Sequence, residues 1–498
     1  MLWRAVCLTA VATSHQPLSI KERTPMWKQN PFFIFSIIFL LTACQSPNKV
    51  SLETAVPPTV NTPQPEPTTT PIPPTGTPIL QPTDTTQPTN PPPTELLPIN
   101  TPETIGTLNY IAYFGGQPAG HWDHDNFNAY QETHPGLETS YYGGSIYTSP
   151  VPKPIHSRLT REETADVFSS FIVGSLQPYV EQGLIMDISD IWAERGWDEV
   201  FPATLKEYVS YEGRQYFVPQ AIQWNPIWYS SDIFAELGLA PPQTWDEFLT
   251  TCNTLHEAGY IPVTVSSITW TPPLARWFTI LNLRLNGPDF HESLMRGDVP
   301  YDDPRVRDVF VHWQEMFAHN CFDDSRVGYG EAADQIYDGR AAMYNLGEWL
   351  SESYSDGLPE TLDFFSFPPI NPDVPPAEIV HLYGAYIHAN TPNLEQAEAY
   401  LTYLGNVESQ TSNVQTINRL VANKAVDPTL YNDVYLRGLE FVEDAGQITQ
   451  LYELNTHPDM AQAGLRAFSA FFADPDDETI DEILTDLESM RGRVFDNE

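Results

Sequence analysis

Basic residues are scarce in this sequence of 498 residues, which holds 24 lysines and arginines against 65 aspartates and glutamates. The formal net charge is −41, and 40 of these charges belong to residues 107–498, because the first 106 residues carry five basic and six acidic side chains. A nucleic-acid backbone requires a basic surface. The composition therefore excludes a nucleic-acid binder, and it disfavours an anionic ligand unless arginines gather locally.

Signatures of catalysis are also missing. The sequence contains no G-x-S-x-G, no HExxH and no P-loop motif. No group of cysteines and histidines has zinc-ligand spacing, and we expect neither a metal nor another cofactor. A glycoside hydrolase needs two carboxylates at a defined separation, which an acidic sequence alone cannot show. A secreted carbohydrate-active enzyme is therefore kept only as an alternative to a binding protein.

The apolar run near the N-terminus is too short to span a membrane. Residues 31–43 read PFFIFSIIFLLTA, which as a helix covers about 20 Å of a hydrocarbon core of roughly 30 Å. Lys28 precedes the run and small residues close it, as in a secretory signal. The closing Leu-Thr-Ala-Cys resembles a bacterial lipobox, so we expect residues 1–43 to be a lipoprotein signal and Cys44 to be lipidated. Met26 begins a more typical signal than the first residue does, and an ordinary signal peptide is the alternative.

Residues 44–106 consist mainly of proline and threonine, as in TPQPEPTTTPIPPTGTP. They show no apolar periodicity, and proline favours polyproline II, so we expect a disordered, extended linker. At about 3.1 Å per residue it would reach on the order of 150 Å. The protein would then be extracytoplasmic and lipid-anchored to the outer face of the cell membrane, with its body on a stalk. A mucin-like glycosylated stalk is the alternative.

Residues 107–498 alternate between strand-like and helix-like segments. Strands are predicted over residues 108–114, 137–142, 214–223, 261–266 and 340–346, and helices over residues 175–183, 244–259, 305–320, 394–407 and 477–495. Residues 165–171 have the pattern of a strand edge that enters a loop. The alternation predicts an α/β fold, and the length predicts two lobes of roughly 200 residues each.

Only four cysteines occur, and two of them fall in the globular part. Cys7 lies before the expected mature product, and Cys44 is assigned to the lipid. An extracytoplasmic location permits a disulfide between Cys252 and Cys321. Two buried free thiols are an equally open alternative.

Several motifs, taken in their order, resemble those of one protein family. HPGLETSYY follows the first predicted helix, and ADVF leads to GLIMDISDIW. The most specific stretch, YEGRQYFVPQAIQWNPIWYSSDIFAELGLAPPQTWDEF, is similar to the family's crossover into a second lobe. YDGRAAMYNLGEWL and LYGAYIHANTPNLEQAEAYLTYL follow. The sequence thus resembles the family 1, carbohydrate-type extracellular solute-binding proteins of ABC transporters, which are similar to maltose-binding protein.

The resemblance implies a two-lobed type II periplasmic-binding-protein-like fold, with a ligand cleft between lobes joined by a hinge. Lobe one would combine about 107–221 with 377–428, and lobe two would combine 222–376 with 429–498. Such a protein would be a monomer that captures a sugar or oligosaccharide by hinge closure and delivers it to ABC permease subunits. A ligand-sensing receptor module on the same fold is the alternative to import.

A sugar presents apolar ring faces, which suit aromatic side chains, and hydroxyls, which need polar partners. The resemblance places Glu348 and Trp349 at a strand-to-loop turn that faces the cleft, with Trp349 as a stacking plate and Glu348 as a hydroxyl acceptor. Trp224, at the presumed crossover, and Trp270, in a later loop, are two more aromatic candidates. The alternatives are a structural Trp349 and a Trp224 that packs the hinge.

The remaining site candidates are Phe114, Gly115 and Gly116 at the end of the first predicted strand, Ser169 and Ser170 after ADVF, and Tyr383. The two glycines would let the backbone approach a ligand closely. The two serines stand where the family often has Asp or Asn as a hydroxyl partner. The tyrosine marks a return crossover.

Other conspicuous residues are expected to be structural. Trp245 begins a helix, with Thr244 as its N-cap and Glu247 three residues later. The histidine- and aspartate-rich residues 121–125 are expected to form a solvated polar loop, not a metal site. Three tryptophans fit helix faces as core residues: Trp192, Trp197 and Trp313. Four arginines are considered too scattered for an anion pocket: Arg276, Arg284, Arg340 and Arg419.

Overall fold

The computed structural model describes residues 106–113, 119–143, 159, 165–171, 177–268, 271–323, 326–354 and 357–496. The expected signal peptide and almost all of the linker fall outside these ranges. So do the candidates Cys44, Phe114, Gly115, Gly116 and Trp270. Within the described ranges, no helix combines the length and the hydropathy that a bilayer crossing needs.

The larger sheet has seven strands among the described residues, in the order β12-β6-β11-β3-β1-β2, with β13 paired to β11. The strands are β1 (Gly106–Ala112), β2 (Leu137–Gly143), β3 (Val167–Phe171), β6 (Val218–Trp224), β11 (Ala377–Ile387), β12 (Leu420–Val421) and β13 (Gln447–Thr449). β1 runs parallel to β2 and β3, since helix α1 (Ala119–Thr133) lies between β1 and β2 in the chain and provides the long return that parallel pairing needs. β11 runs antiparallel to β3 and β6.

The smaller sheet has four strands in the described part of the chain, in the order β10-β7-β9-β8. They are β7 (Ile227–Ser230), β8 (Ile261–Thr264), β9 (Ala341–Asn345) and β10 (Leu362–Phe365). Helices α8 (Trp245–Glu257) and α12 (Tyr329–Tyr337) lead into β8 and β9, which are parallel. A separate short hairpin joins β4 (Ser210–Tyr211) and β5 (Arg214–Gln215).

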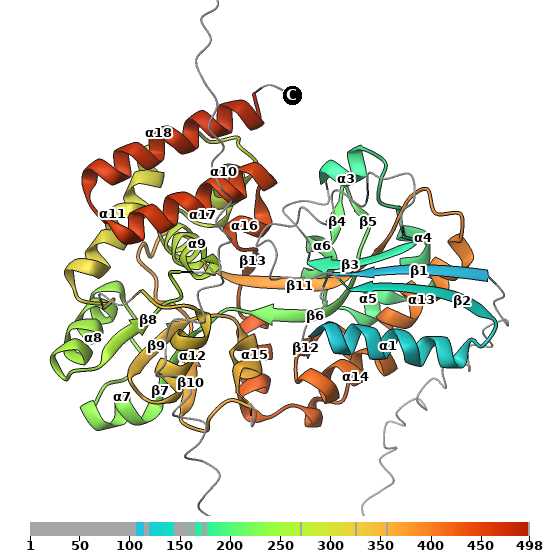
Figure 1. Ribbon diagram of the computed structural model, residues 1–498, viewed down its shortest axis with the longest axis horizontal. Helices are drawn as coiled ribbons and strands as arrows, with labels where there is room; N and C mark the ends of the chain where they lie inside the picture. Colours follow the sequence, from blue (N-terminus) through green and yellow to red (C-terminus); the bar gives the residue numbers. More distant parts are fainter. Residues whose placement is uncertain are drawn as a thin grey trace, which may run out of the picture. The chain divides into compact units, whose positions relative to one another are not determined.

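Helices cover both sheets. The others are α3 (Gln177–Glu181), α4 (Ser189–Glu194), α5 (Trp197–Val200), α6 (Ala203–Tyr208), α7 (Ser231–Leu237), α9 (Pro272–Asn286), α10 (Pro288–Met295), α11 (Pro304–Ala318), η4 (Glu348–Ser353), α13 (Leu394–Gly405), α14 (Val407–Ile417), η5 (Pro428–Leu430), α15 (Asp433–Glu443), α16 (Tyr452–Asn455), α17 (Pro458–Ala473) and α18 (Asp477–Val494). Figure 1 shows α9, α11 and α17 close together, where Phe278 meets Phe310 at 5.6 Å and Phe468 at 4.6 Å between ring centroids.

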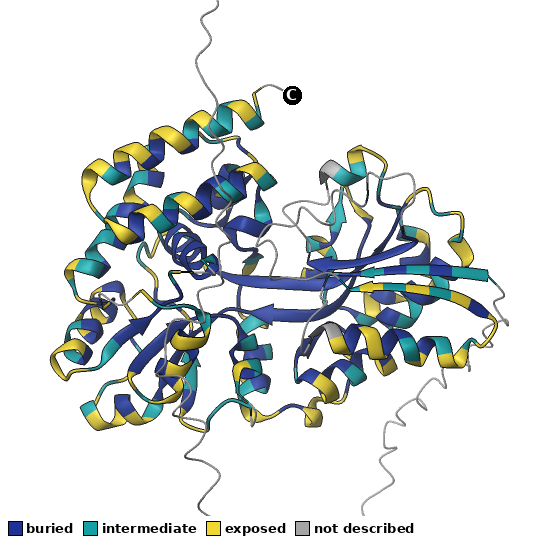
Figure 2. Cartoon of the chain, in the orientation of Figure 1, coloured by how far each residue is buried: buried dark blue, intermediate teal, exposed yellow. Residues whose placement is uncertain are grey.

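Two antiparallel strands connect the sheets. Only Asn225 and Pro226 separate β6, in the larger sheet, from β7, in the smaller. All eleven residues of β11 are buried, and they pair with β13 at one end and β3 at the other. β6 and β11 lie side by side in Figure 1, and Figure 2 shows both as buried along their length. β6 thus leads directly from the larger sheet into the smaller one.

The structure confirms most of the predicted elements and corrects one expectation. α8 begins at Trp245, where the N–H of Glu247 donates to the Thr244 hydroxyl at 3.2 Å, as the capping pattern predicts. β3 confirms the strand predicted within residues 165–171, and it lies between β1 and β11 in the larger sheet. Residues 121–125 form part of α1, so a polar loop is the wrong expectation, and Asp123 is only 2% exposed. The three expected core tryptophans are buried: Trp192, Trp197 and Trp313.

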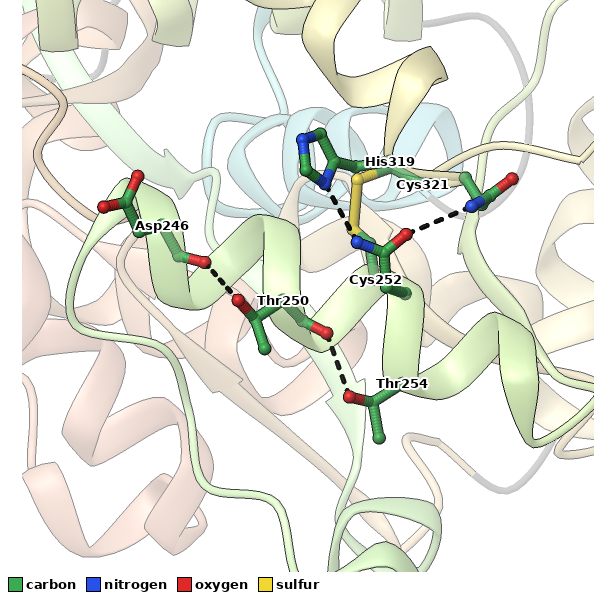
Figure 3. The surroundings of a disulfide bond; sticks show 8 residues. Asp246, Thr250, Cys252, Thr254, His319 and Cys321 are labelled. Carbon is green, nitrogen blue, oxygen red and sulfur yellow. Dashed lines mark hydrogen bonds between the residues drawn. A yellow bond between two sulfur atoms is a disulfide. The ribbon is translucent and has the colours of Figure 1, made fainter.

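A disulfide joins Cys252 to Cys321, which is the pairing that the sequence leaves open. It connects α8 to the segment that follows α11, with 4.8 Å between the two Cα atoms. Figure 3 shows that polar contacts flank it: Asn253 Nδ2 lies 2.9 Å from His319 Nδ1. Because the bridge closes a separation of 69 residues, it removes much conformational freedom from the unfolded chain.

Candidate functional site

The turn after β9 carries Glu348 and Trp349, as predicted. β9 ends at Asn345, and Leu346 and Gly347 lead into η4. The Trp349 ring lies against this turn, since a Cβ on Gly347 would come within 1.9 Å of a ring carbon. Only glycine fits there while the ring keeps its place. Glu348 is completely buried and Trp349 is partly buried.

Two side chains from other elements contact the Trp349 ring. The Arg276 guanidinium, from α9, lies 4.7 Å from the ring centroid, and the His381 ring, from β11, lies 6.0 Å away. Arg276 Nε donates to Asn225 Oδ1 at 3.1 Å, and Asn225 Nδ2 donates to the Ile379 carbonyl at 3.2 Å. The segment between β6 and β7 thus holds the arginine in place over the ring.

Burial governs the charges around Arg276. It lowers the pKa of Arg276 to about 10, and the Glu453 carboxyl, from α16, is the strongest opposing influence. Burial also raises the pKa of Glu453 to about 7, against the effect of Arg276. Glu453 Oε2 has no hydrogen-bond partner among the described residues. The carboxyl therefore has capacity to accept a hydrogen bond from something that this chain does not supply.

The Glu348 carboxyl also lacks hydrogen-bond donors from described side chains. Burial raises its pKa to about 8, and Arg419, whose Nε lies 3.8 Å from Glu348 Oε1, opposes this. Arg419 is largely committed to Glu352, with which it makes a short ion pair. No described side chain donates a hydrogen bond to either Glu348 oxygen.

Two neutral groups complete the set. Burial, together with Arg276, holds the pKa of His381 well below its usual value, so the imidazole is neutral. Within the described ranges, His381 Nε2 and the hydroxyl of Tyr344 in β9 have no hydrogen-bond partner. We call Arg276, Tyr344, Glu348, Trp349, His381 and Glu453 the Trp349 cluster. An unsatisfied buried polar group costs about 1–3 kcal/mol, so such groups point to a missing partner.

The larger sheet approaches this cluster through the ends of β1 and β3. Phe171, the last residue of β3, makes an edge contact with His381 at 5.9 Å between centroids. Tyr113, which follows β1, contacts Phe171 at 5.4 Å. Burial raises the pKa of Tyr113 to about 12, and Glu453 adds to this effect. The Trp349 cluster thus combines Tyr344 of the smaller sheet and His381 of the larger sheet with residues from α9, η4 and α16.

The structure places Ser169 and Ser170 within β3 and Tyr383 within β11. Ser169 Oγ lies 2.6 Å from the Tyr110 hydroxyl and 2.5 Å from the Tyr383 hydroxyl. Ser170 Oγ donates to the carbonyl of the next residue, Phe171. All three site candidates are 1% exposed or less.

Trp224 packs among other aromatic side chains, as the structural alternative to a ligand-binding role expects. It is 0% exposed, with ring centroids at 4.5 Å from Phe364, 5.4 Å from Trp228 and 5.7 Å from Phe441. A Cβ on Gly438 would come within 2.6 Å of its ring, so α15 packs closely against it. Its ligand-binding role remains a prediction without a contact to support it.

Sequence reasoning missed four members of the cluster: Arg276, Tyr344, His381 and Glu453. The four arginines have separate partners: Arg276 lies on Trp349, Arg419 pairs with Glu352, Arg284 with Glu378 and Arg340 with Glu331. A signal was present, since Arg276 interrupts the apolar helix PPLARWFTIL and Glu453 follows the apolar LY. A lone charge in an apolar run needs a buried partner. No group of three or more His, Cys, Asp or Glu suited to a metal occurs in the described part.

Comparison with known proteins agrees with this architecture. The family model for bacterial extracellular solute-binding proteins matches residues 117–411, more than half of the chain. An uncharacterized ABC transporter extracellular-binding protein of Pyrococcus horikoshii is 24% identical over 269 residues, which cover 51% of this chain and 58% of that protein. A probable sugar-binding periplasmic protein of Mesorhizobium japonicum is 22% identical, with coverage of 35% and 42%. The chain thus spans about half the length of these curated relatives.

Solved structures extend the likeness to the whole body. The bacterial solute receptor AcbH, described as having an exclusive preference for β-D-galactopyranose, matches with a TM-score of 0.70 and 24% identity. The match covers 79% of this chain and all of that one. At this identity the likeness shows the fold, which is the predicted α/β, two-lobed type II periplasmic-binding fold. From the extent of the family match, the chain belongs to the bacterial extracellular solute-binding protein family.

Proposed function

We propose that this protein captures a sugar or oligosaccharide outside the cytoplasm for an ABC importer. One observation carries the proposal: buried polar atoms of Glu348, His381 and Glu453 lack partners around a partly buried tryptophan. Hydroxyl groups supply both donors and acceptors, and the apolar face of a sugar ring suits an aromatic neighbour. Relatives named as sugar-binding and the galactose-binding structural neighbour support the same ligand class.

The proposed mechanism is closure around the solute. Without a solute, the closed arrangement buries several polar groups that have no partner, at a cost of about 1–3 kcal/mol each. An open form returns these groups to water. A solute that satisfies them in the closed form shifts the population toward closure by its differential affinity. β6 and β11 are the strands that would bend, because they connect the sheets.

The remaining parts of the proposal concern organisation. Residues 1–43 would be a signal peptide, and residues 44–106 a linker after a lipidated Cys44. Lobe one would combine about 107–221 with 377–428, and lobe two 222–376 with 429–498. The closed monomer would dock on permease subunits without altering its solute, so we propose no catalytic role.

A thermal-shift screen against a carbohydrate panel tests the proposal. A solute that binds only the native state raises the melting temperature. We expect at least one neutral sugar to do so, with no product after prolonged incubation. A panel without any shift would contradict sugar capture, and appearance of a product would favour the secreted carbohydrate-active enzyme instead.

The anchor has a separate test. Cys44→Ser should move the protein from the membrane fraction to the medium or periplasm, because lipidation requires the thiol. Cys7→Ser is the matched control and should leave the distribution unchanged. A membrane-bound Cys44→Ser variant would contradict the lipid anchor without touching the proposal of solute capture.

A further inference from the structure

Four buried side chains from four elements form a closed ring of hydrogen bonds. In α1, Asp123 Oδ1 lies 3.0 Å from the Tyr110 hydroxyl, and Asp123 Oδ2 lies 2.5 Å from the Tyr383 hydroxyl. The Ser169 hydroxyl lies between the same two tyrosines, at 2.6 and 2.5 Å. We call these four residues the Asp123 ring. It links α1, β1, β3 and β11.

A count of hydrogens decides which form of Asp123 completes the ring. Four oxygen–oxygen contacts need four hydrogens. The two phenols and the serine hydroxyl supply one each, so an ionised Asp123 leaves one contact without a hydrogen. A neutral Asp123 supplies the fourth. Each member then donates once and accepts once around the ring: Asp123 to Tyr110, Tyr110 to Ser169, Ser169 to Tyr383, and Tyr383 back to Asp123.

The surroundings of the ring also favour the neutral acid. All four residues are at most 2% exposed. Burial raises the pKa of Asp123 to about 7, although the two phenol hydrogen bonds and Arg419 oppose the rise. The titratable and charged groups that act on it from packed elements are Tyr110, Tyr141, Tyr383, Tyr400 and Arg419. Burial raises the pKa of all four phenols, so they remain neutral and Arg419 is the one charge among these five.

Contacts between aromatic rings connect the Asp123 ring with the Trp349 cluster. Residues two apart on a strand share a face of the sheet, so Ser169 and Phe171 lie on one face, as do His381 and Tyr383. Phe171 contacts Tyr383 at 5.5 Å and His381 at 5.9 Å, and His381 contacts Trp349 at 6.0 Å. The hydrogen bond between Ser169 and Tyr383 thus ties together the two strands that carry Phe171 and His381 to the cluster.

We propose that Asp123 is a positioning residue for the solute site: as a neutral acid, it closes a ring that fixes β3 and β11 where they present Phe171 and His381 to Trp349. The proton is taken from water and returned to it, and no covalent bond changes. The inference rests on the proposed function only in taking the Trp349 cluster to be the site that binds a solute. The proton itself is a property of the ligand-free chain.

Carboxyl ¹³C NMR of the ligand-free wild type tests the proton directly. We expect one aspartate carboxyl to titrate near pH 7, about three pH units above an ordinary aspartate. Asp123→Asn should remove that signal, because the variant has no carboxyl at this position. Its amide can donate and accept in the same directions as the neutral acid, so the ring of hydrogen bonds should be kept. Asp125→Asn, two residues along α1 and exposed, is the matched control and should leave the signal in place. If every aspartate titrates below about pH 5, the proposal is overturned.

A second reporter separates positioning from mere burial. The ring C–H signals of His381 should shift with the same midpoint as Asp123 in the wild type and stay constant in Asp123→Asn, since His381 itself does not titrate there. A His381 signal that is constant in the wild type would overturn the positioning role even if the proton exists. For any solute found in the panel, wild-type affinity should fall about threefold or more between roughly pH 6 and pH 8.5, and that of Asp123→Asn should not. Failure to find a solute would reject the proposed function, while the two NMR readouts still decide this inference.

Discussion

The Asp123 ring and the Trp349 cluster are both buried and both hold carboxyl groups, yet they differ in one respect. In the ring, each oxygen of Asp123 lies within hydrogen-bond distance of a buried tyrosine hydroxyl, at 3.0 and 2.5 Å. In the cluster, no described side chain donates to either oxygen of Glu348. Burial raises the pKa of both acids, to about 7 and about 8.

The difference separates polar groups that organise the fold from polar groups that await a partner. A satisfied buried network makes a structure more rigid and more specific, whereas an unsatisfied one destabilises the state that contains it. The ring should therefore keep its hydrogen bonds with and without solute. The cluster should change its behaviour as soon as a solute supplies hydrogen-bond donors.

The largest expected effect comes from the disulfide, which touches neither region. The double change Cys252→Ala and Cys321→Ala should lower the free energy of unfolding by roughly 4 kcal/mol, because a separation of 69 residues is no longer closed in the unfolded chain. Urea unfolding measures this. The rise in melting temperature caused by solute should persist. A loss of that rise would show that the two regions are not independent of the disulfide.

Tyr383→Phe should break the Asp123 ring, and we expect it to lower the free energy of unfolding by the next largest amount. It leaves Asp123 and Ser169 each without one partner, which costs about 1–3 kcal/mol for each unsatisfied group. We expect the urea midpoint to fall clearly. Tyr337→Phe is the control, because Tyr337 is 53% exposed and belongs to neither region. Equal stability of the two variants would mean that the ring contributes nothing to the fold.

The sequence predicts the fold better than it predicts the site, for a physical reason. The alternation of helices and strands and the Thr244 cap depend on residues close in the chain, and the structure confirms them. The turn with Glu348 and Trp349 comes from a motif of the same local kind. Arg276 and His381 reach Trp349 from 73 and 32 residues away, and no local pattern records that approach. Ser169 and Tyr383 lie within β3 and β11, and both are buried, because tertiary packing covers these strands.

Trp349→Ala tests the cluster directly. We expect solute affinity to fall by about tenfold or more, equivalent to about 1.4 kcal/mol, with little change in unfolding, because the ring is only partly buried. Isothermal titration with a solute from the panel measures the affinity. Trp245→Phe is the aromatic control in α8, which has no place in the cluster, and it should bind solute normally. Unchanged affinity in Trp349→Ala would remove this residue from the site.

The sharpest test of the comparison sets the two acids against each other. An acid whose folded pKa is raised loses stability as pH rises from its unfolded pKa to its folded pKa. For Glu348 this interval runs from 4.5 to about 8, and for Asp123 from 3.8 to about 7. Without solute, the melting temperature of the wild type should therefore fall across these intervals relative to both Glu348→Gln and Asp123→Asn.

Saturating solute should then separate the two regions. Donors from the solute stabilise the ionised Glu348, which lowers its pKa and removes the pH-dependent difference between the wild type and Glu348→Gln. The difference between the wild type and Asp123→Asn should remain, because the ring has its own donors. If solute removes both differences or neither, the division into a self-sufficient ring and an incomplete cluster is wrong.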